Sequence, residues 1–136
     1  MKIYLANFDK LSPSINEEVH KYAKRLSGSV EIATLKNSTA FEKKFPAAQF
    51  TRIILSEEGK LMSTKQLAEW LNPKLSKNMV FLVGSAYGIE PQLKQSADLL
   101  LSLSPLTFSH KHAFLLLTEQ IYRCLMLIKG HPYHHE

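Results

Sequence analysis

Short apolar runs alternate along this chain with longer segments in which apolar residues recur every three or four positions. The runs predict five β-strands, at residues 2–6, 30–35, 51–55, 79–83 and 99–103. The run at 79–83 is apolar throughout, which is typical of a strand that helices cover on both faces. The segments between the runs predict helices. This order predicts a single α/β domain over residues 1–136 with a mostly parallel five-stranded sheet.

Two of the predicted helix starts carry a recognisable signature. Ser14 with Glu17, and Ser63 with Gln66, have the spacing of a capping box, in which each side chain accepts a hydrogen bond from the backbone N–H of the other residue. The first pair predicts a helix that Gly28 ends. The second pair predicts a helix in the middle of the chain.

Three further helices are expected: a short one within residues 36–49, one that begins at Pro91, and a long one over 110–129. The long helix is apolar on nearly all sides but carries Glu119 and Arg123 near its centre. Two charges there make a membrane span unfavourable, so we expect a helix buried in a water-soluble protein. Because one sheet covers only one side of it, a second copy of the subunit is the expected cover, and the chain's own tail is the alternative.

In an open parallel sheet, ligands bind beyond the carboxyl ends of the strands. Three predicted loops lie at such ends: residues 56–62, 84–89 and 104–109. The second begins Gly-Ser-Ala-Tyr-Gly, which can bring backbone N–H groups close to a ligand but matches neither the dinucleotide fingerprint nor the Walker motif. A turn that binds nothing, and a small-molecule enzyme with a phosphate site at Gly84, therefore stay open as alternatives.

The composition adds modest constraints. Of the 136 residues, 45% are hydrophobic and 21% are charged, which excludes collagen-like, disordered and disulfide-scaffold classes. Cys124 is the single cysteine and lies in an apolar run, so we expect a buried thiol in a reducing compartment, and a cytoplasmic protein by default. The N-terminal stretch lacks a signal-peptide pattern. A net charge of +5 mildly favours a polyanionic partner.

Histidines gather toward the C-terminus, where five of the six fall within residues 110–135. A metal site is nevertheless not expected. On a helix His110 and His112 would point about 200° apart, and no cysteine or acidic cluster completes a ligand set.

Four segments, in order along the chain, resemble one known family. They are Phe-Leu-Val-Gly-Ser-Ala-Tyr-Gly-Ile at 81–89, Leu-Ser-Leu-Ser-Pro-Leu-Thr-Phe-Ser-His at 101–110, Glu-Gln-Ile-Tyr-Arg at 119–123, and His-Pro-Tyr-His at 131–134. Together they resemble the RlmH family of SPOUT-class, S-adenosylmethionine-dependent methyltransferases, which modify N3 of a pseudouridine in large-subunit (23S) ribosomal RNA. The resemblance implies a homodimer, a C-terminal trefoil knot, and action on the assembled ribosome.

The resemblance also implies roles for individual residues. The expected cofactor-binding residues are Ser56, Glu57, Gly84, Ser85, Ser104, Pro105, Leu106, Thr107, Phe108, Ser109 and Tyr133. The expected catalytic residues are His134, as first candidate for the base that takes the N3 proton, His110 as second, and Arg123 as a phosphate contact.

This chain departs from the family pattern at two positions that bear on activity. Ser85 stands where a second glycine is usual, and Phe114 stands where an arginine is frequent. A non-catalytic RNA-binding relative with a degenerate cofactor pocket is therefore the alternative function.

Overall fold

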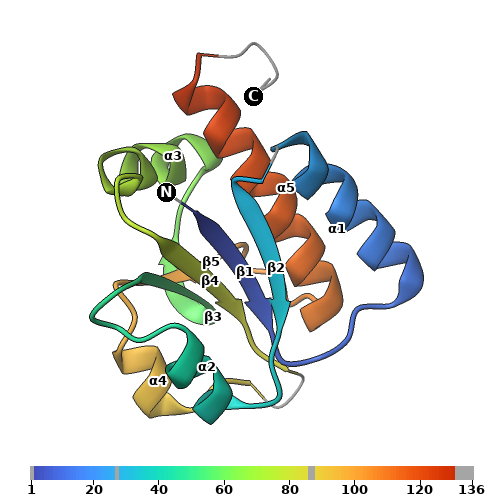
Figure 1. The fold of residues 1–136 in the computed structure, drawn as a ribbon, viewed down its shortest axis with the longest axis vertical. Coiled ribbons are helices and arrows are strands. Elements are labelled where there is room, and N and C mark those ends of the chain that lie inside the picture. The colour runs from blue at the N-terminus through green and yellow to red at the C-terminus, as the bar shows by residue number, and fades with distance from the viewer. Residues whose placement is uncertain (1, 27, 86–87, 131–136) are drawn as a thin grey trace.

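Five strands form one fully parallel sheet in the computed structural model, which describes residues 2–26, 28–85 and 88–130 (Figure 1). The order across the sheet is β2-β1-β4-β3-β5. The strands are β1 (Ile3–Asn7), β2 (Val30–Thr34), β3 (Thr51–Leu61), β4 (Met79–Val83) and β5 (Leu99–Ser102). Strand and helix alternate along the chain, so the predicted α/β class and five-stranded parallel sheet are confirmed.

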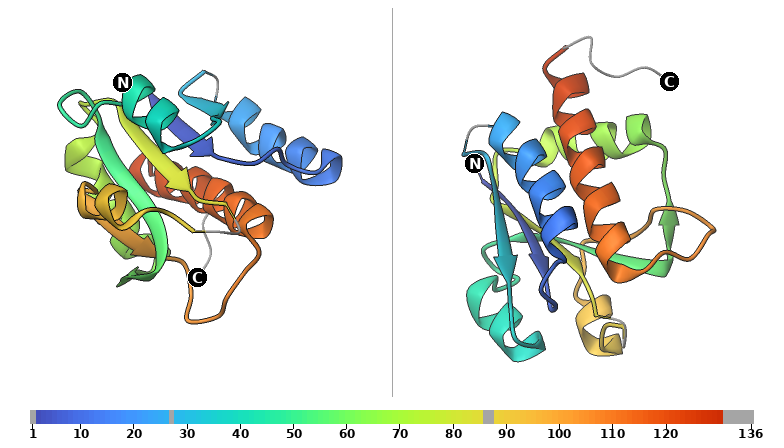
Figure 2. Two further views of the ribbon diagram at one scale, coloured as in Figure 1. Left: turned by 90° about the horizontal axis from the view of Figure 1, so that it is seen from below. Right: turned by 90° about the vertical axis from the view of Figure 1, so that its right-hand side faces the viewer.

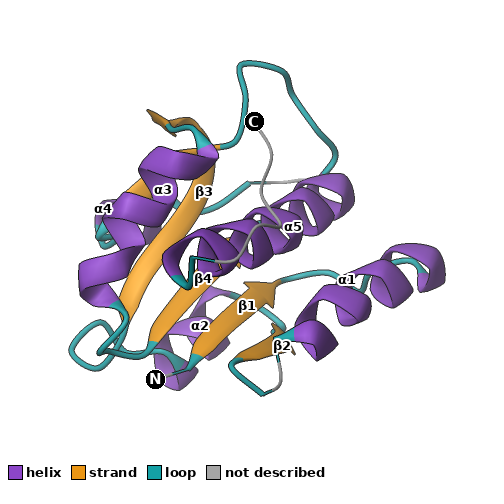
Figure 3. Cartoon of the chain, turned by 90° about the horizontal axis from the view of Figure 1, so that it is seen from above, coloured by secondary structure: helices purple, strands orange, loops and turns teal. Residues whose placement is uncertain are grey.

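Helices cover both faces of this sheet (Figure 3). The helices are α1 (Pro13–Arg25), α2 (Ser38–Lys44), α3 (Thr64–Leu71) with a 3-10 turn η1 (Asn72–Lys74), α4 (Pro91–Gln95) and α5 (His110–Ile128). One hydrophobic cluster joins the sheet to α1, α3 and α5, and a second joins its other face to α2 and α4. Helices α1 and α5 lie side by side over the first face (Figure 2).

Strand β4 is covered by helices on both faces, which explains its run of five apolar residues. All five of its residues are buried, and they alternate between the two clusters: Met79, Phe81 and Val83 face one cluster, and Val80 and Leu82 face the other. Because side chains on a strand alternate between faces, a strand covered on both sides cannot carry polar positions. The interpretation of residues 79–83 as a strand covered on both faces is confirmed.

The two predicted capping boxes had different outcomes. Ser63 and Gln66 form the predicted box at the start of α3, with both reciprocal hydrogen bonds present. The box at Ser14 and Glu17 was wrong, since α1 begins at Pro13 with Ser12 as its N-cap, two residues before the predicted N-cap. Proline has no N–H to satisfy and its fixed φ suits the first helical position, so this helix starts without a side-chain cap.

Cys124 lies on α5 and is fully buried, as expected from its apolar surroundings. Burial raises the pKa of its thiol to about 12, because the charged thiolate is disfavoured away from water. The thiol is therefore protonated at neutral pH and acts as part of the core. None of the described helices is long and apolar enough to cross a membrane.

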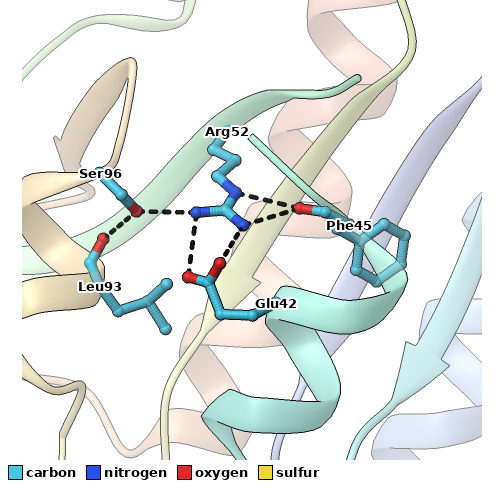
Figure 4. Close-up of polar contacts among 5 residues, drawn as sticks. All are labelled: Glu42, Phe45, Arg52, Leu93 and Ser96. Atoms are coloured by element: carbon cyan, nitrogen blue, oxygen red, sulfur yellow. Dashed lines mark hydrogen bonds and ion pairs between the residues drawn. The ribbon is translucent and has the colours of Figure 1, made fainter. Parts of the chain in front are cut away.

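A buried arginine ties both helices of the second face to the sheet (Figure 4). Arg52 of β3 is 1% exposed, and its guanidinium makes five hydrogen bonds: two to the Glu42 carboxylate at 2.8 and 3.1 Å, two to the Phe45 carbonyl oxygen at 2.8 and 3.1 Å, and one to Ser96 Oγ at 2.9 Å. These bonds satisfy its five N–H donors. The same guanidinium lies 5.2 Å from the centre of the Phe41 ring. Arg52 thus holds α2 and the end of α4 in place.

Replacing this arginine should therefore destabilise the fold. We expect Arg52→Met, which keeps most of the side-chain length, to lower the free energy of unfolding by about 1–3 kcal/mol, because it leaves the buried Phe45 carbonyl oxygen without its donors. Urea unfolding followed by circular dichroism measures this. Lys21→Met is the matched control: it removes an exposed ion pair with Glu18 and should leave stability unchanged. Equal stabilities for the two variants would contradict the role given to Arg52.

Candidate active site

A cavity of about 630 Å³ opens at the carboxyl ends of three neighbouring strands, β4, β3 and β5. Its walls come from residues 55–58 of β3, the ends of β4 and β5 with the loops that follow them, α4, and the first turn of α5. The residues around it are Leu55, Ser56, Glu57, Glu58, Val83, Gly84, Ser85, Gly88, Ile89, Lys94, Leu101, Ser102, Leu103, Ser104, Leu106, Thr107, Phe108, Ser109, His110 and Ala113. The position is the one expected for a ligand in a parallel α/β sheet.

The first wall is a bulge in β3, and here the sequence prediction needs correction. Residues 56–62 were expected as a loop, but β3 continues to Leu61. Leu55 and Lys60 both pair with Leu101 of β5, so residues 56–59 bulge out between them and the strand then resumes. The polar side chains predicted a loop. They are compatible with a strand because this part of β3 is exposed and pairs through its backbone. Ser56 and Glu57, two expected cofactor ligands, lie on this bulge and line the cavity.

Gly59 is what allows the bulge to close onto β5. A Cβ atom at this position would lie 2.7 Å from the backbone carbonyl carbons of Leu100 and Leu101. Backbone atoms in a paired strand cannot move aside as a side chain can, so the position requires glycine.

The second wall is the turn after β4. Ser85 and Gly88 pair across it, and the Gly88 N–H donates to the Ser85 carbonyl oxygen at 2.9 Å. A Cβ atom on Gly84 would lie 2.5 Å from Cγ1 of Ile89, so this glycine is required by the packing of the turn itself. Gly84 and Ser85 both line the cavity, as the sequence predicted for their loop.

The third wall is the loop between β5 and α5. The hydroxyl of Ser104 accepts a hydrogen bond from the Leu106 N–H at 3.0 Å, and Ser109 caps α5 by accepting from the His112 N–H at 3.3 Å. Leu106 and Phe108 are 71% and 37% exposed although they are large and apolar. Of the six expected cofactor residues in this loop, Pro105 alone is not among those that line the cavity.

His110, the first residue of α5, lines the cavity next to this loop. Its Nε2 atom is buried and lies 3.1 Å from Oδ2 of Asp9, which follows β1. The ring is not oriented for a hydrogen bond through this atom, so the contact is an ion pair that forms when the imidazole is protonated. Sequence reasoning singled out His110 but missed Asp9, because the two residues are far apart in the chain.

The same corner of the molecule holds a second unsatisfied polar group. Among the described residues, the buried side-chain nitrogen and oxygen atoms without a hydrogen bond are Nε2 of His110 and both polar atoms of Asn7. Asn7 ends β1 and pairs in register with Val83, which lines the cavity. Unsatisfied buried polar groups are costly, so their gathering at one place points to a functional site.

Lys94 of α4 also lines the cavity and was not anticipated from the sequence. Its ammonium lies 3.7 Å from a carboxylate oxygen of Glu58, on the β3 bulge. The cavity therefore offers two carboxylates, from Glu57 and Glu58, and one ammonium group, within walls that combine apolar side chains with serine and threonine hydroxyls.

Arg123, a third expected catalytic residue, does not line this cavity. Arg123 is thirteen residues along α5 from His110, which corresponds to about 20 Å at 1.5 Å per residue, and it pairs with Glu119 at 3.3 Å. Tyr133 and His134 lie outside the described residues. Within the described part of the chain, no group of three or more histidine, cysteine, aspartate or glutamate residues is placed to hold a metal ion.

Residues 1–134 match the family described as predicted SPOUT methyltransferases. The chain belongs to this family and, within it, to the group of ribosomal RNA large subunit methyltransferase H. It is 44% identical to the protein of that name from Synechococcus over 126 residues, which cover 88% of this chain and 84% of the relative. It is 40% identical to the one from Thermus thermophilus over 119 residues, 85% of each chain.

Solved structures with the same fold are more distant in sequence. A probable methylase family protein from Haemophilus influenzae has a TM-score of 0.65 at 11% identity, over 98% of this chain and 70% of that one. The SpoU methyltransferase AviRb from Streptomyces viridochromogenes, solved in complex with AdoMet, has a TM-score of 0.58 at 11% identity, over 91% of this chain and 57% of that one. At these identities the likeness concerns the fold alone.

The bulge at residues 56–59 gives a direct test of how the cavity is built. We expect Gly59→Ala to lower the free energy of unfolding by about 1–3 kcal/mol, because the new methyl group overpacks the β5 backbone. Thermal unfolding of the variant measures this. Lys60→Ala, at the next and exposed position of β3, is the control and should unfold like the wild-type protein. A Gly59→Ala protein as stable as that control would show that the close approach to β5 is not required.

Proposed function

We propose that this chain transfers a methyl group from S-adenosylmethionine to N3 of a pseudouridine in large-subunit ribosomal RNA, on the assembled ribosome in the cytoplasm. The observation that carries the proposal is the cavity at the carboxyl ends of β3, β4 and β5, with His110 on its wall. Membership of the SPOUT family and relatives named ribosomal RNA large subunit methyltransferase H supply the class of reaction and of substrate.

The residues around the cavity suit S-adenosylmethionine. A cavity of about 630 Å³ lies within the usual range for small-molecule sites. Leu55, Val83 and Leu101 offer apolar surface for an adenine ring, and the Glu57 carboxylate offers an acceptor for ribose hydroxyls or an ammonium group. Lys94 offers a cation for a carboxylate. When bound, the cofactor supplies a methyl group activated by the sulfonium centre.

We propose His110 as the base that takes the proton from N3 of the substrate. An imide nitrogen is a poor nucleophile until it loses its proton, and a neutral imidazole is a suitable acceptor near pH 7. His110 lines the cavity at the start of α5 and has a carboxylate beside it. His134 stays the other candidate for this role.

Contact with RNA is proposed to involve the positive charge of the protein. The net charge of +5 favours phosphate, and Arg123, 26% exposed at its side chain, is proposed as a phosphate contact. One subunit of this size has little surface for reading a nucleotide sequence. Recognition of ribosome shape is therefore part of the proposal.

We propose a homodimer formed through α5 and the loop before it. Leu115, Leu116 and Leu127 of α5 are only partly buried, and Leu106 of the loop is 71% exposed. A second copy would cover this apolar surface, which a lone subunit exposes to water. Residues of one subunit would then also lie near the cavity of the other.

A trefoil knot in the C-terminal part of the chain is also proposed. In support, β5 lies at the edge of the sheet beside β3, whereas α5, which directly follows it, contacts α1, α3 and the central strand β4. The chain therefore returns across the sheet after its last strand. Threading through the preceding loops would make it an exception to the rule that chains are unknotted.

A transfer assay with radiolabelled S-adenosylmethionine tests the proposed function on intact ribosomes, separated large subunits and naked ribosomal RNA. We expect label on the ribosomes from the wild-type protein. His110→Gln should lower kcat by about 10²–10⁴-fold, the usual contribution of a general base. His20→Gln is the matched control: this residue of α1 is exposed, contacts only a backbone oxygen of its own helix, and does not line the cavity, so the activity of this variant should stay within a few-fold of wild type.

Two results would contradict parts of this proposal. Equal activities for His110→Gln and His20→Gln would rule out His110 as the base and favour His134. No label on any substrate, together with no heat of S-adenosylmethionine binding in calorimetry, would favour the non-catalytic RNA-binding relative instead.

A further inference from the structure

We infer that Asp9 is a positioning residue for His110: the negative charge of its carboxylate beside Nε2 favours the hydrogen on that nitrogen, so that Nδ1 is the nitrogen that accepts the substrate proton. The inference rests on the proposed function and deepens it by naming the accepting atom and the group that prepares it.

The two ring nitrogens of His110 have different surroundings. Nε2 is buried and lies 3.1 Å from Oδ2 of Asp9. Nδ1 makes no hydrogen bond to the described residues, and it is not among the buried unsatisfied atoms, so it is open to solvent. Because the residue lines the cavity, the open nitrogen is the one that a ligand can approach.

The charge on Asp9 determines which nitrogen carries the hydrogen. A carboxylate accepts hydrogen bonds and cannot donate them, so a neutral ring beside it is more stable with its hydrogen on Nε2. The lone pair then sits on Nδ1, which is the form a base requires.

The proton and electron movements can be stated for the chain's own residues. The proton on N3 of the substrate moves to Nδ1 of His110, and the N3 electron pair forms the new bond to the methyl carbon as the carbon–sulfur bond breaks and its pair stays on sulfur. His110 becomes an imidazolium with hydrogen on both nitrogens. The Asp9 carboxylate balances that charge, and the ring returns its proton to water after product leaves.

A purely structural role explains the pair less well. The side chain of Asp9 is 41% exposed, and ion pairs that are open to water add little to stability. The pair also leaves Nε2 without a hydrogen bond, and the Asn7 side chain in the strand just before Asp9 is likewise unsatisfied. In a region that serves stability alone, these polar atoms would have hydrogen-bond partners. Polar atoms left without partners are more typical of a functional site.

The first arm of the test reads the histidine itself, without cofactor or RNA. Ring nitrogen chemical shifts of ¹⁵N-labelled protein, with the His110 signals assigned through His110→Gln, give the populations of the two neutral tautomers. We expect the wild-type ring to carry its hydrogen on Nε2, and Asp9→Asn to shift the population toward Nδ1. Identical tautomer populations in the two proteins would overturn the inference.

The second arm is a double-mutant cycle measured by methyl transfer to ribosomes. Asp9→Asn should lower kcat by about 10–100-fold, which is less than the loss expected for His110→Gln. KM and the affinity for S-adenosylmethionine should change by less than about threefold. In the His110→Gln background, Asp9→Asn should have no further effect, because it acts through that ring. Glu18→Gln, which removes an exposed carboxylate from its pair with Lys21, is the control and should match wild type.

Each result has a defined reading. Losses that multiply in the double variant would show that Asp9 acts independently of His110 and would overturn the inference. A loss of activity that follows a fall in melting temperature would do the same. If the wild-type protein transfers no methyl group to any RNA, the proposed function fails, and the tautomer measurement still decides whether Asp9 positions His110.

Discussion

The burial of β4 on both faces is the constraint on which the rest of this structure depends. A central strand with no polar position needs helices above and below it, and strands joined through such covering helices run parallel. Parallel strands point to one edge of the sheet, so the bulge in β3 and the loops after β4 and β5 meet there and enclose a cavity. On the second face the helices α2 and α4 are short and bury little apolar area. The hydrogen bonds of Arg52 add to their attachment to the sheet.

The candidate site combines rigid walls with a few charged groups. Backbone pairing fixes the bulge of β3 against β5, and the turn after β4 packs on itself through Gly84 and Ile89. Onto this frame the chain adds two charged pairs, Glu58 with Lys94 and His110 with Asp9. Rigid walls suit transfer between two bound molecules, where alignment of the reacting atoms supplies much of the rate.

Much of the fold could be predicted from the sequence because its elements have strong local signals. The apolar run at 79–83, the capping box at Ser63 and the proline at Pro91 each produced the expected element. The extension of β3 could not be predicted, because its polar residues are held by backbone pairing with a strand that lies forty residues further on. The start of α1 was misplaced because Ser14 and Glu17 have capping-box spacing inside a helix that proline begins.

Most of the expected cofactor residues line one cavity, because their segments follow neighbouring strands of one parallel sheet. Asp9 and Lys94 could be recognised only in the folded structure. The central claim is that this cavity is where the methyl donor binds. A crystal structure with S-adenosylhomocysteine tests it most directly. We expect the ligand to lie between the β3 bulge, the Gly84 turn and the 103–109 loop, with its sulfur toward His110. A ligand bound at any other place on the protein would contradict it.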